Sequence, residues 1–184
     1  MNFVFENLYH VYNQGNNKET IFLCDEDYKI FLRLVKRLIS PHCEILAWCL
    51  MPNHFHLMIY IKDDRMKLVQ GNLELDPLAN GIRKLLSGYA RIFNKKYDRS
   101  GSLFRQKTKA KNLSDIEIRS GDRLNLSSDY LNCFLYIHQN PLAALLVKDL
   151  KDWPWSSYPD YADLRKGTLC NKEIAFKFCD ITSV

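Results

Sequence analysis

Two histidines stand one residue apart in the apolar run MPNHFHLMIY, which extends from Met51 to Tyr60. Because successive side chains of a strand point to opposite faces, His54 and His56 are expected to share one face of a strand. Neutral imidazole is the commonest metal ligand in proteins, so this pair could direct two nitrogens at one ion. Two ligands do not complete a metal site, and this run alone therefore favours a structural role for both rings.

A tyrosine and an asparagine four residues apart, Tyr136 and Asn140, form a second candidate pair in the segment SSDYLNCFLYIHQNP. The spacing of its apolar stripe predicts a helix that ends or kinks at Pro141, with the stripe at Leu131, Phe134, Leu135 and His138. Residues four apart lie on one face of a helix, so a phenol and an amide oxygen are presented together. In a strand, Tyr136, His138 and Asn140 would instead share a face. The helix interpretation makes His138 a packed core residue.

Together these pairs suggest phosphoryl-transfer chemistry. A divalent cation held by His54, His56 and the side-chain oxygen of Asn140 could stabilise charge on a phosphate oxygen. Tyr136 would lie beside it as the nucleophile, although a free phenol, with a pKa of about 10, is a poor nucleophile at neutral pH without such help. The product would be a phosphotyrosine. Because one phosphodiester is exchanged for another, the broken strand could be resealed without a nucleotide cofactor.

Basic and aromatic residues alternate between positions 91 and 111, in the stretch RIFNKKYDRSGSLFRQKTKAK. Single-stranded nucleic acid is bound by this combination, because cations contact the phosphates and rings stack on unpaired bases. A solvated helix face followed by a charged edge strand would look similar. The candidate DNA-binding residues are Arg91, Lys95, Lys96, Tyr97, Arg99, Arg105, Lys107, Lys109 and Lys111.

The elements that must position these residues follow a strand, helix, strand, strand, helix, strand order. Alternation and helical periodicity predict strands at 6–15, 43–51, 54–61 and 102–113 and helices at 25–39 and 77–97. This order predicts an α+β fold, a ferredoxin-like split βαβ sandwich with an antiparallel sheet. Helices should cover one face of the sheet, and the open face would present the two histidines.

Composition places limits on the class of protein. The chain has 184 residues, of which 47% are hydrophobic, and a formal net charge of +5. It is expected to form one domain over residues 1–150, with a tail at 151–184 that packs on the same domain. No apolar run is long enough to span a membrane and no secretory signal begins the chain, so a cytoplasmic location is expected. The six cysteines form no CxxC pair, which favours reduced thiols.

The sequence resembles the REP-associated tyrosine transposases, which are single-tyrosine members of the HUH endonuclease superfamily close to small single-strand insertion-sequence transposases. The resemblance rests on YHVYNQGNN, MPNHFHLMI, NKKYDRSGSLF, YIHQNPLAA and WPWSSYPDY, in the family's order. It implies Mg²⁺ or Mn²⁺ bound by His54 and His56, with Asn140 as third ligand and Tyr136 as catalytic nucleophile. The substrate would be single-stranded DNA beside a hairpin, cleaved to a 5′-phosphotyrosine and a free 3′-hydroxyl by a monomer or a homodimer.

Two features depart from the family pattern, and two other functions stay open. The stretch Ile116–Leu126 is longer than expected before the tyrosine helix, and PLAALLV lacks the basic residue and glycine common after the NP pair. One alternative is a non-catalytic single-stranded nucleic-acid binder, which needs only the basic aromatic stretch. The other is a metal hydrolase that uses activated water, which needs the histidines but not Tyr136.

Overall fold

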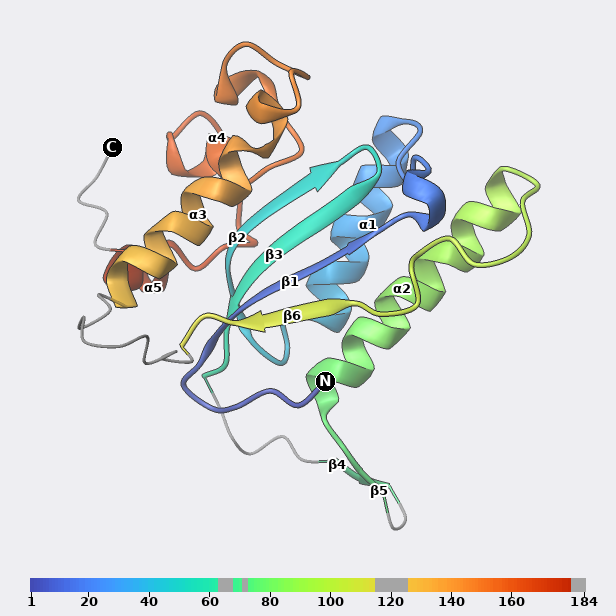
Figure 1. Ribbon diagram of the computed structural model, residues 1–184, viewed down its shortest axis with the longest axis horizontal. Helices are drawn as coiled ribbons and strands as arrows, with labels where there is room; N and C mark the ends of the chain where they lie inside the picture. Colours follow the sequence, from blue (N-terminus) through green and yellow to red (C-terminus); the bar gives the residue numbers. More distant parts are fainter. Residues whose placement is uncertain (63–67, 71–72, 115–125, 180–184) are drawn as a thin grey trace.

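The fold is built on a four-stranded antiparallel sheet with the strand order β2-β3-β1-β6 (Figure 1). The computed structural model describes residues 1–62, 68–70, 73–114 and 126–179. The four strands are β1 (Leu8–Gln14), β2 (Glu44–Met51), β3 (His54–Tyr60) and β6 (Lys109–Asn112). A separate pair, β4 (Leu68–Gln70) and β5 (Leu73–Leu75), precedes the second long helix. The predicted α+β, ferredoxin-like class is confirmed.

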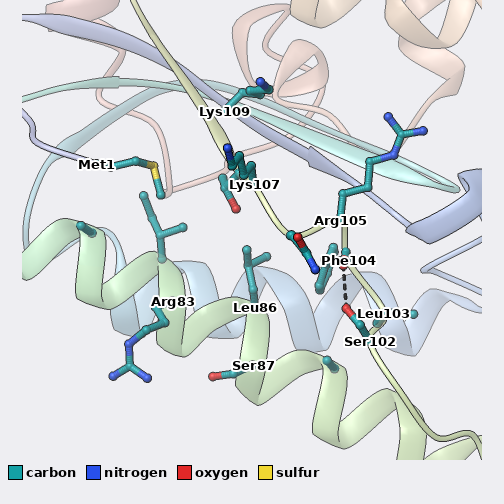
Figure 2. Close-up of a pocket in the computed structure, with 15 residues that line it drawn as sticks. Met1, Arg83, Leu86, Ser87, Ser102, Leu103, Phe104, Arg105, Lys107 and Lys109 are labelled. Atoms are coloured by element: carbon teal, nitrogen blue, oxygen red, sulfur yellow. Dashed lines mark hydrogen bonds between the residues drawn. The ribbon is translucent and has the colours of Figure 1, made fainter.

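The edge strand β6 is shorter than the strand predicted at 102–113. Residues 102–108 instead run alongside helix α2 (Pro77–Lys96), where they line a groove (Figure 2). The buried Asn13 of β1 holds this segment, because its amide donates to the carbonyl of Arg105 at 3.1 Å and to Thr108 Oγ1 at 2.9 Å. The regular ladder is interrupted here, and backbone pairing resumes at an isolated bridge between Gly15 and Phe104, where the Arg105 amide donates to the carbonyl of Gln14 at 2.9 Å.

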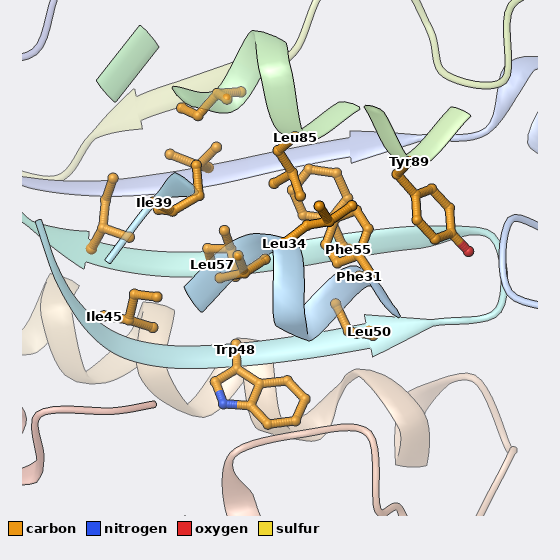
Figure 3. Packing of buried hydrophobic residues seen from close by; sticks show 14 of the residues in the cluster. Phe31, Leu34, Ile39, Ile45, Trp48, Leu50, Phe55, Leu57, Leu85 and Tyr89 are labelled. Atoms are coloured by element: carbon orange, nitrogen blue, oxygen red, sulfur yellow. The ribbon is translucent and has the colours of Figure 1, made fainter. Parts of the chain in front are cut away.

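Helices α1 (Asp25–Leu38) and α2 cover one face of the sheet and enclose the larger hydrophobic core (Figure 3). Phe31 of α1 packs between Phe55 of β3 and Tyr89 of α2, and all three side chains are nearly inaccessible to solvent. The two helices approach closely at Gly81, where an added Cβ would lie 2.3 Å from the carbonyl oxygen of Leu38. The hydroxyl of Tyr89 donates to the carbonyl of Ile21, which gives this buried phenol a packing role.

Helices α3 (Leu126–Ala143) and α5 (Lys172–Cys179) lie on the opposite face of the sheet, so the prediction of an open second face was wrong. Phe134 and Ile137 of α3 pack there against Cys49 of β2 and Met58 of β3. The strands also present apolar side chains on this face. The apolar stripe of α3 is buried by packing against them.

Helix α3 bears out the helical interpretation of the tyrosine segment, and it continues past Pro141 to Ala143. The prediction was that the helix ends or kinks at Pro141, and the structure shows that it does not end there. His138 is 3% exposed, and its Nε2 lies 2.7 Å from Ser157 Oγ, so it is the packed core residue that its place in the stripe predicts. The insertion noted at Ile116–Leu126 falls outside the described residues, except for Leu126 at the first position of the helix.

The chain after α3 passes through two short helices, η2 (Leu150–Asp152) and α4 (Tyr158–Tyr161), and contacts β2 between them. The Leu50 amide donates to the carbonyl of Trp155 at 2.8 Å, and the Ser157 amide donates to the carbonyl of Trp48 at 2.9 Å. The Trp155 ring stacks on Tyr28 of α1 with centroids 4.5 Å apart.

A short helix η1 (Asn16–Lys18) follows β1. Among the described residues, helices are too short or too polar to cross a membrane.

Candidate active site

The two histidines of β3 lie on the sheet face that α3 covers. In the strand register His56 is opposite Tyr12 of β1 and Cys49 of β2, and residues paired in this way have side chains on one face. His54 is half-buried and His56 is 4% exposed. Their ring centroids are 4.9 Å apart and the rings are perpendicular. The alternation of the strand thus brings the pair side by side, as predicted.

The turn before β3 sets the tautomer of His54. His54 Nδ1 lies 2.6 Å from Asn53 Oδ1, and the amide nitrogen of Asn53 donates to the carbonyl of Lys18 at 3.2 Å. This second bond orients the amide so that its oxygen faces His54, and an amide oxygen only accepts. The His54 proton is therefore on Nδ1, which leaves the lone pair on Nε2.

His56 has one ring nitrogen with a partner and one without. Its Nδ1 lies 2.8 Å from Nε2 of His10, which comes from the neighbouring strand β1. Its Nε2 is buried and has no hydrogen-bond partner within the described part of the chain. A buried polar atom without a partner is costly, so such an atom in a native structure requires an explanation.

Burial keeps the histidines of this face neutral. Burial lowers the pKa of His56 to about 2, and the adjacent rings of His10 and His54 add to this effect because they compete for the same positive charge. Burial lowers the pKa of His10 to about 4, and the positive charge of Lys111 lowers it further. Burial also lowers the pKa of His54, and the Asn140 side chain opposes this shift because it accepts a hydrogen bond from the protonated ring. Neutral imidazole is the form that binds metal ions.

Helix α3 brings Tyr136 and Asn140 to the same place. The Tyr136 ring meets His56 edge to face with centroids 5.6 Å apart, and it meets His10 in the same way at 5.9 Å. Its side chain is 52% exposed, so the phenol is accessible to a large substrate. Asn140 Nδ2 donates to the carbonyl of Tyr136 at 2.7 Å, so Oδ1 is the Asn140 atom that can interact with His54. The structure therefore brings together all four predicted catalytic and metal-ligating residues.

The atoms of this site that could bind a metal ion are two imidazole nitrogens and an amide oxygen. Within the described ranges, groups of three or more His, Cys, Asp and Glu side chains suited to a metal ion are absent. His10 does not add a third nitrogen, because its Nε2 is directed at His56. The partnerless Nε2 of His56, beside the His54 ring that Asn140 contacts, fits a small cation with open coordination positions.

The candidate DNA-binding residues do not form one patch. Lys109 and Lys111 of β6 pair with Tyr12 and His10 of β1, so their exposed side chains share the sheet face of the histidines. Three others are engaged in contacts within the protein. Lys96 and Tyr97 bind Asp27 in the first turn of α1, and Arg99 binds Glu19, which follows η1. The remaining four are exposed elsewhere, on α2 and on the segment that precedes β6: Arg91, Lys95, Arg105 and Lys107.

The segment before β6 and helix α2 enclose a groove of about 550 Å³ (Figure 2). Arg105, Lys107 and Arg83 lie along it, and Leu86 points from α2 toward the segment. The helix covers the sheet face opposite the histidines. This groove is therefore separate from the site at Tyr136.

His10 is the site residue that the motif analysis did not identify. The sequence does indicate part of this arrangement, because the alternation of LYHVYNQ places His10 and Tyr12 on one face of β1. What the alternation did not reveal is that β1 lies beside β3, with His10 and His56 as diagonal neighbours.

Comparisons with known proteins identify the fold. No protein-family model and no curated protein matches the sequence. Among solved structures, the chain is similar to a REP-associated tyrosine transposase bound to a REP hairpin. The TM-score is 0.63 at 16% sequence identity, over 89% of this chain and 83% of that one. The resemblance seen in the sequence is thereby confirmed at the level of the fold, which this chain shares with a REP-associated tyrosine transposase.

Proposed function

We propose that this protein is a transposase-like enzyme that cleaves and rejoins single-stranded DNA through a covalent 5′-phosphotyrosine at Tyr136. The observation that carries the proposal is the contact of an exposed phenol with a buried histidine whose Nε2 has no partner among the residues that the structure describes. A phenol packed for stability alone would be buried and bonded, as Tyr89 is. The shared fold with a REP-associated tyrosine transposase supports the same function.

In the proposed reaction the Tyr136 oxygen attacks the phosphorus of the scissile phosphodiester. A bond forms between the phenolic oxygen and phosphorus, the bond from phosphorus to the 3′ oxygen breaks, and the phenolic proton is transferred overall to the released 3′ oxygen, which becomes a hydroxyl. The reverse attack by a 3′-hydroxyl reseals the strand. Cleavage and resealing each break one phosphoester bond and form another, so a nucleotide cofactor is unnecessary.

His54, His56 and Asn140 would hold Mg²⁺ or Mn²⁺ through two Nε2 atoms and one Oδ1 atom. When bound, such an ion supplies positive charge for the oxygens of the scissile phosphate. Imidazole nitrogens also suit Zn²⁺ and Ni²⁺, so the ligand set is compatible with several divalent ions. The chain's own contribution is orientation, because the Asn53 bond directs the lone pair of His54 and the Tyr136 carbonyl directs the amide of Asn140.

The proposed substrate is single-stranded DNA that contains a hairpin. The exposed side chains of Lys109 and Lys111 share the face of Tyr136 and could contact phosphates on either side of the scissile bond. The structural neighbour was solved with a REP hairpin, which supports the hairpin as the form to test first.

The test compares three proteins on end-labelled single-stranded hairpin DNA with Mn²⁺. Tyr136→Phe removes the proposed nucleophile, and Tyr130→Phe is the matched control, because it removes a hydroxyl of the same helix that bonds to Ser114 instead. Denaturing gels are read for a covalent protein-DNA adduct. Adduct with the wild type and Tyr130→Phe, but not with Tyr136→Phe, is the expected result.

Other outcomes of the same experiment would contradict the proposal. Cutting by the wild type and by Tyr136→Phe alike would indicate a hydrolase that uses activated water. Binding by all three proteins without cutting would indicate a non-catalytic single-strand binder.

A further inference from the structure

The contact between His10 and His56 joins two strands through a single proton. His10 Nε2 and His56 Nδ1 are 2.8 Å apart, and both side chains are more than nine-tenths buried. When both rings are neutral, one nitrogen of this pair donates and the other accepts. The choice decides which form of His56 the site contains.

The two arrangements have opposite consequences for His56 Nε2. If His10 donates, the proton of His56 is on Nε2, and a buried N–H points into the site without an acceptor in the described part of the chain. If His10 accepts, the proton of His56 is on Nδ1, and Nε2 carries a lone pair. Only the second arrangement gives His56 the same form that Asn53 imposes on His54.

From this geometry we infer that His10 is a positioning residue that accepts the Nδ1 proton of His56 and so directs the Nε2 lone pair of His56 toward the proposed cation. The inference rests on the metal site of the proposed function. Partners of this kind fix the tautomer and orientation of a ligating histidine, and their loss typically lowers metal affinity about 10- to 100-fold. A packing role alone would need the ring of His10 but not its nitrogen.

The first test reads the tautomer directly in the metal-free wild-type protein. Long-range ¹H–¹⁵N NMR spectra of ring-labelled histidines separate protonated from unprotonated ring nitrogens, and His56→Gln assigns the signals. The expected result is a His56 ring protonated at Nδ1 and unprotonated at Nε2. A His56 ring protonated at Nε2 would overturn the inference, and the tautomer itself is read in the wild-type protein.

The second test measures Mn²⁺ affinity by calorimetry without DNA. His10→Phe keeps a ring but removes the acceptor, whereas His10→Gln restores an acceptor at a similar distance. Tyr12→Phe is the matched control, since Tyr12 is on the same strand and face and its ring lies 5.8 Å from that of His56. The expected loss is about 10- to 100-fold for His10→Phe, with the control unchanged and His10→Gln closer to the wild type.

The outcomes separate this inference from the proposed function. Absence of Mn²⁺ binding by the wild type would contradict the metal site itself. Normal affinity of His10→Phe, in a protein whose wild type binds Mn²⁺, would overturn only the role given to His10. Equal losses in His10→Phe and Tyr12→Phe would assign the effect to packing and would also overturn it.

Discussion

The buried His138 of α3 predicts a specific loss of stability in mild acid. Burial lowers the pKa of His138 to about 3, whereas in an unfolded chain its pKa is near 6.5. As the pH falls below about 6.5, the unfolded chain binds a proton that the folded protein does not bind. Protonation therefore favours the unfolded state, and the contribution of this neutral histidine to stability decreases from that pH downward.

The magnitude follows from the two pKa values. Between about pH 7.5 and pH 5.5 the unfolded chain gains almost one proton at this position and the folded chain gains almost none, which lowers the free energy of unfolding by about 1.4 kcal/mol. His138→Gln removes the titrating group. Its free energy of unfolding should therefore fall less over this range than that of the wild type, by about 1.4 kcal/mol. His10 and His56 are present in both proteins, so their contributions cancel.

The assay is urea unfolding at the two pH values, with the pH dependence compared rather than the absolute stability. Ser157→Ala is the control, because Ser157 Oγ bonds to His138 and to the Trp48 backbone. This variant should lose about 1–3 kcal/mol at both pH values but keep the wild-type pH dependence. Equal pH dependence of the wild type and His138→Gln would refute the reasoning.

Two further predictions concern DNA binding and helix packing. Replacing both Lys109 and Lys111 by alanine should weaken single-stranded DNA binding, and it should reduce the slope of log affinity against log salt concentration by about 1.4, at about 0.7 per lost phosphate contact. Lys29→Ala on α1 should change neither the affinity nor this slope. Fluorescence anisotropy at several salt concentrations measures both quantities. Gly81→Ala should lower the free energy of unfolding by about 1–3 kcal/mol, because its Cβ would meet the last carbonyl of α1, whereas Gly88→Ala, with open space around it, should not destabilise the protein in the same urea assay.

The local features of the site could be predicted from the sequence because each depends on the regular spacing of side chains within one strand or one helix. Alternation in β3 was sufficient to place His54 beside His56, and helical spacing was sufficient to place Tyr136 and Asn140 on one side of α3. The order of strands and helices also predicted the sheet, since few arrangements satisfy it.

The relations between elements could not be predicted in the same way. The segment before β6 is held by hydrogen bonds from Asn13, whose partners are more than ninety positions away in the chain. The side of the sheet that α3 covers depends on the apolar side chains that both strands leave there, and His10 meets His56 only through the register of β1 with β3. Each of these is set by tertiary pairing rather than by local pattern.

The side of the sheet that α3 covers is also what makes the proposed chemistry possible. Phe134 and Ile137 bury one stripe of the helix against β2 and β3, and Tyr136, one position before Ile137, is turned away from that stripe and stays half exposed. The core contacts of α3 therefore fix where the phenol can reach. Since His138 and Ser157 tie the same helix to β2, a change that loosens this buried contact should reduce adduct formation without altering any proposed ligand.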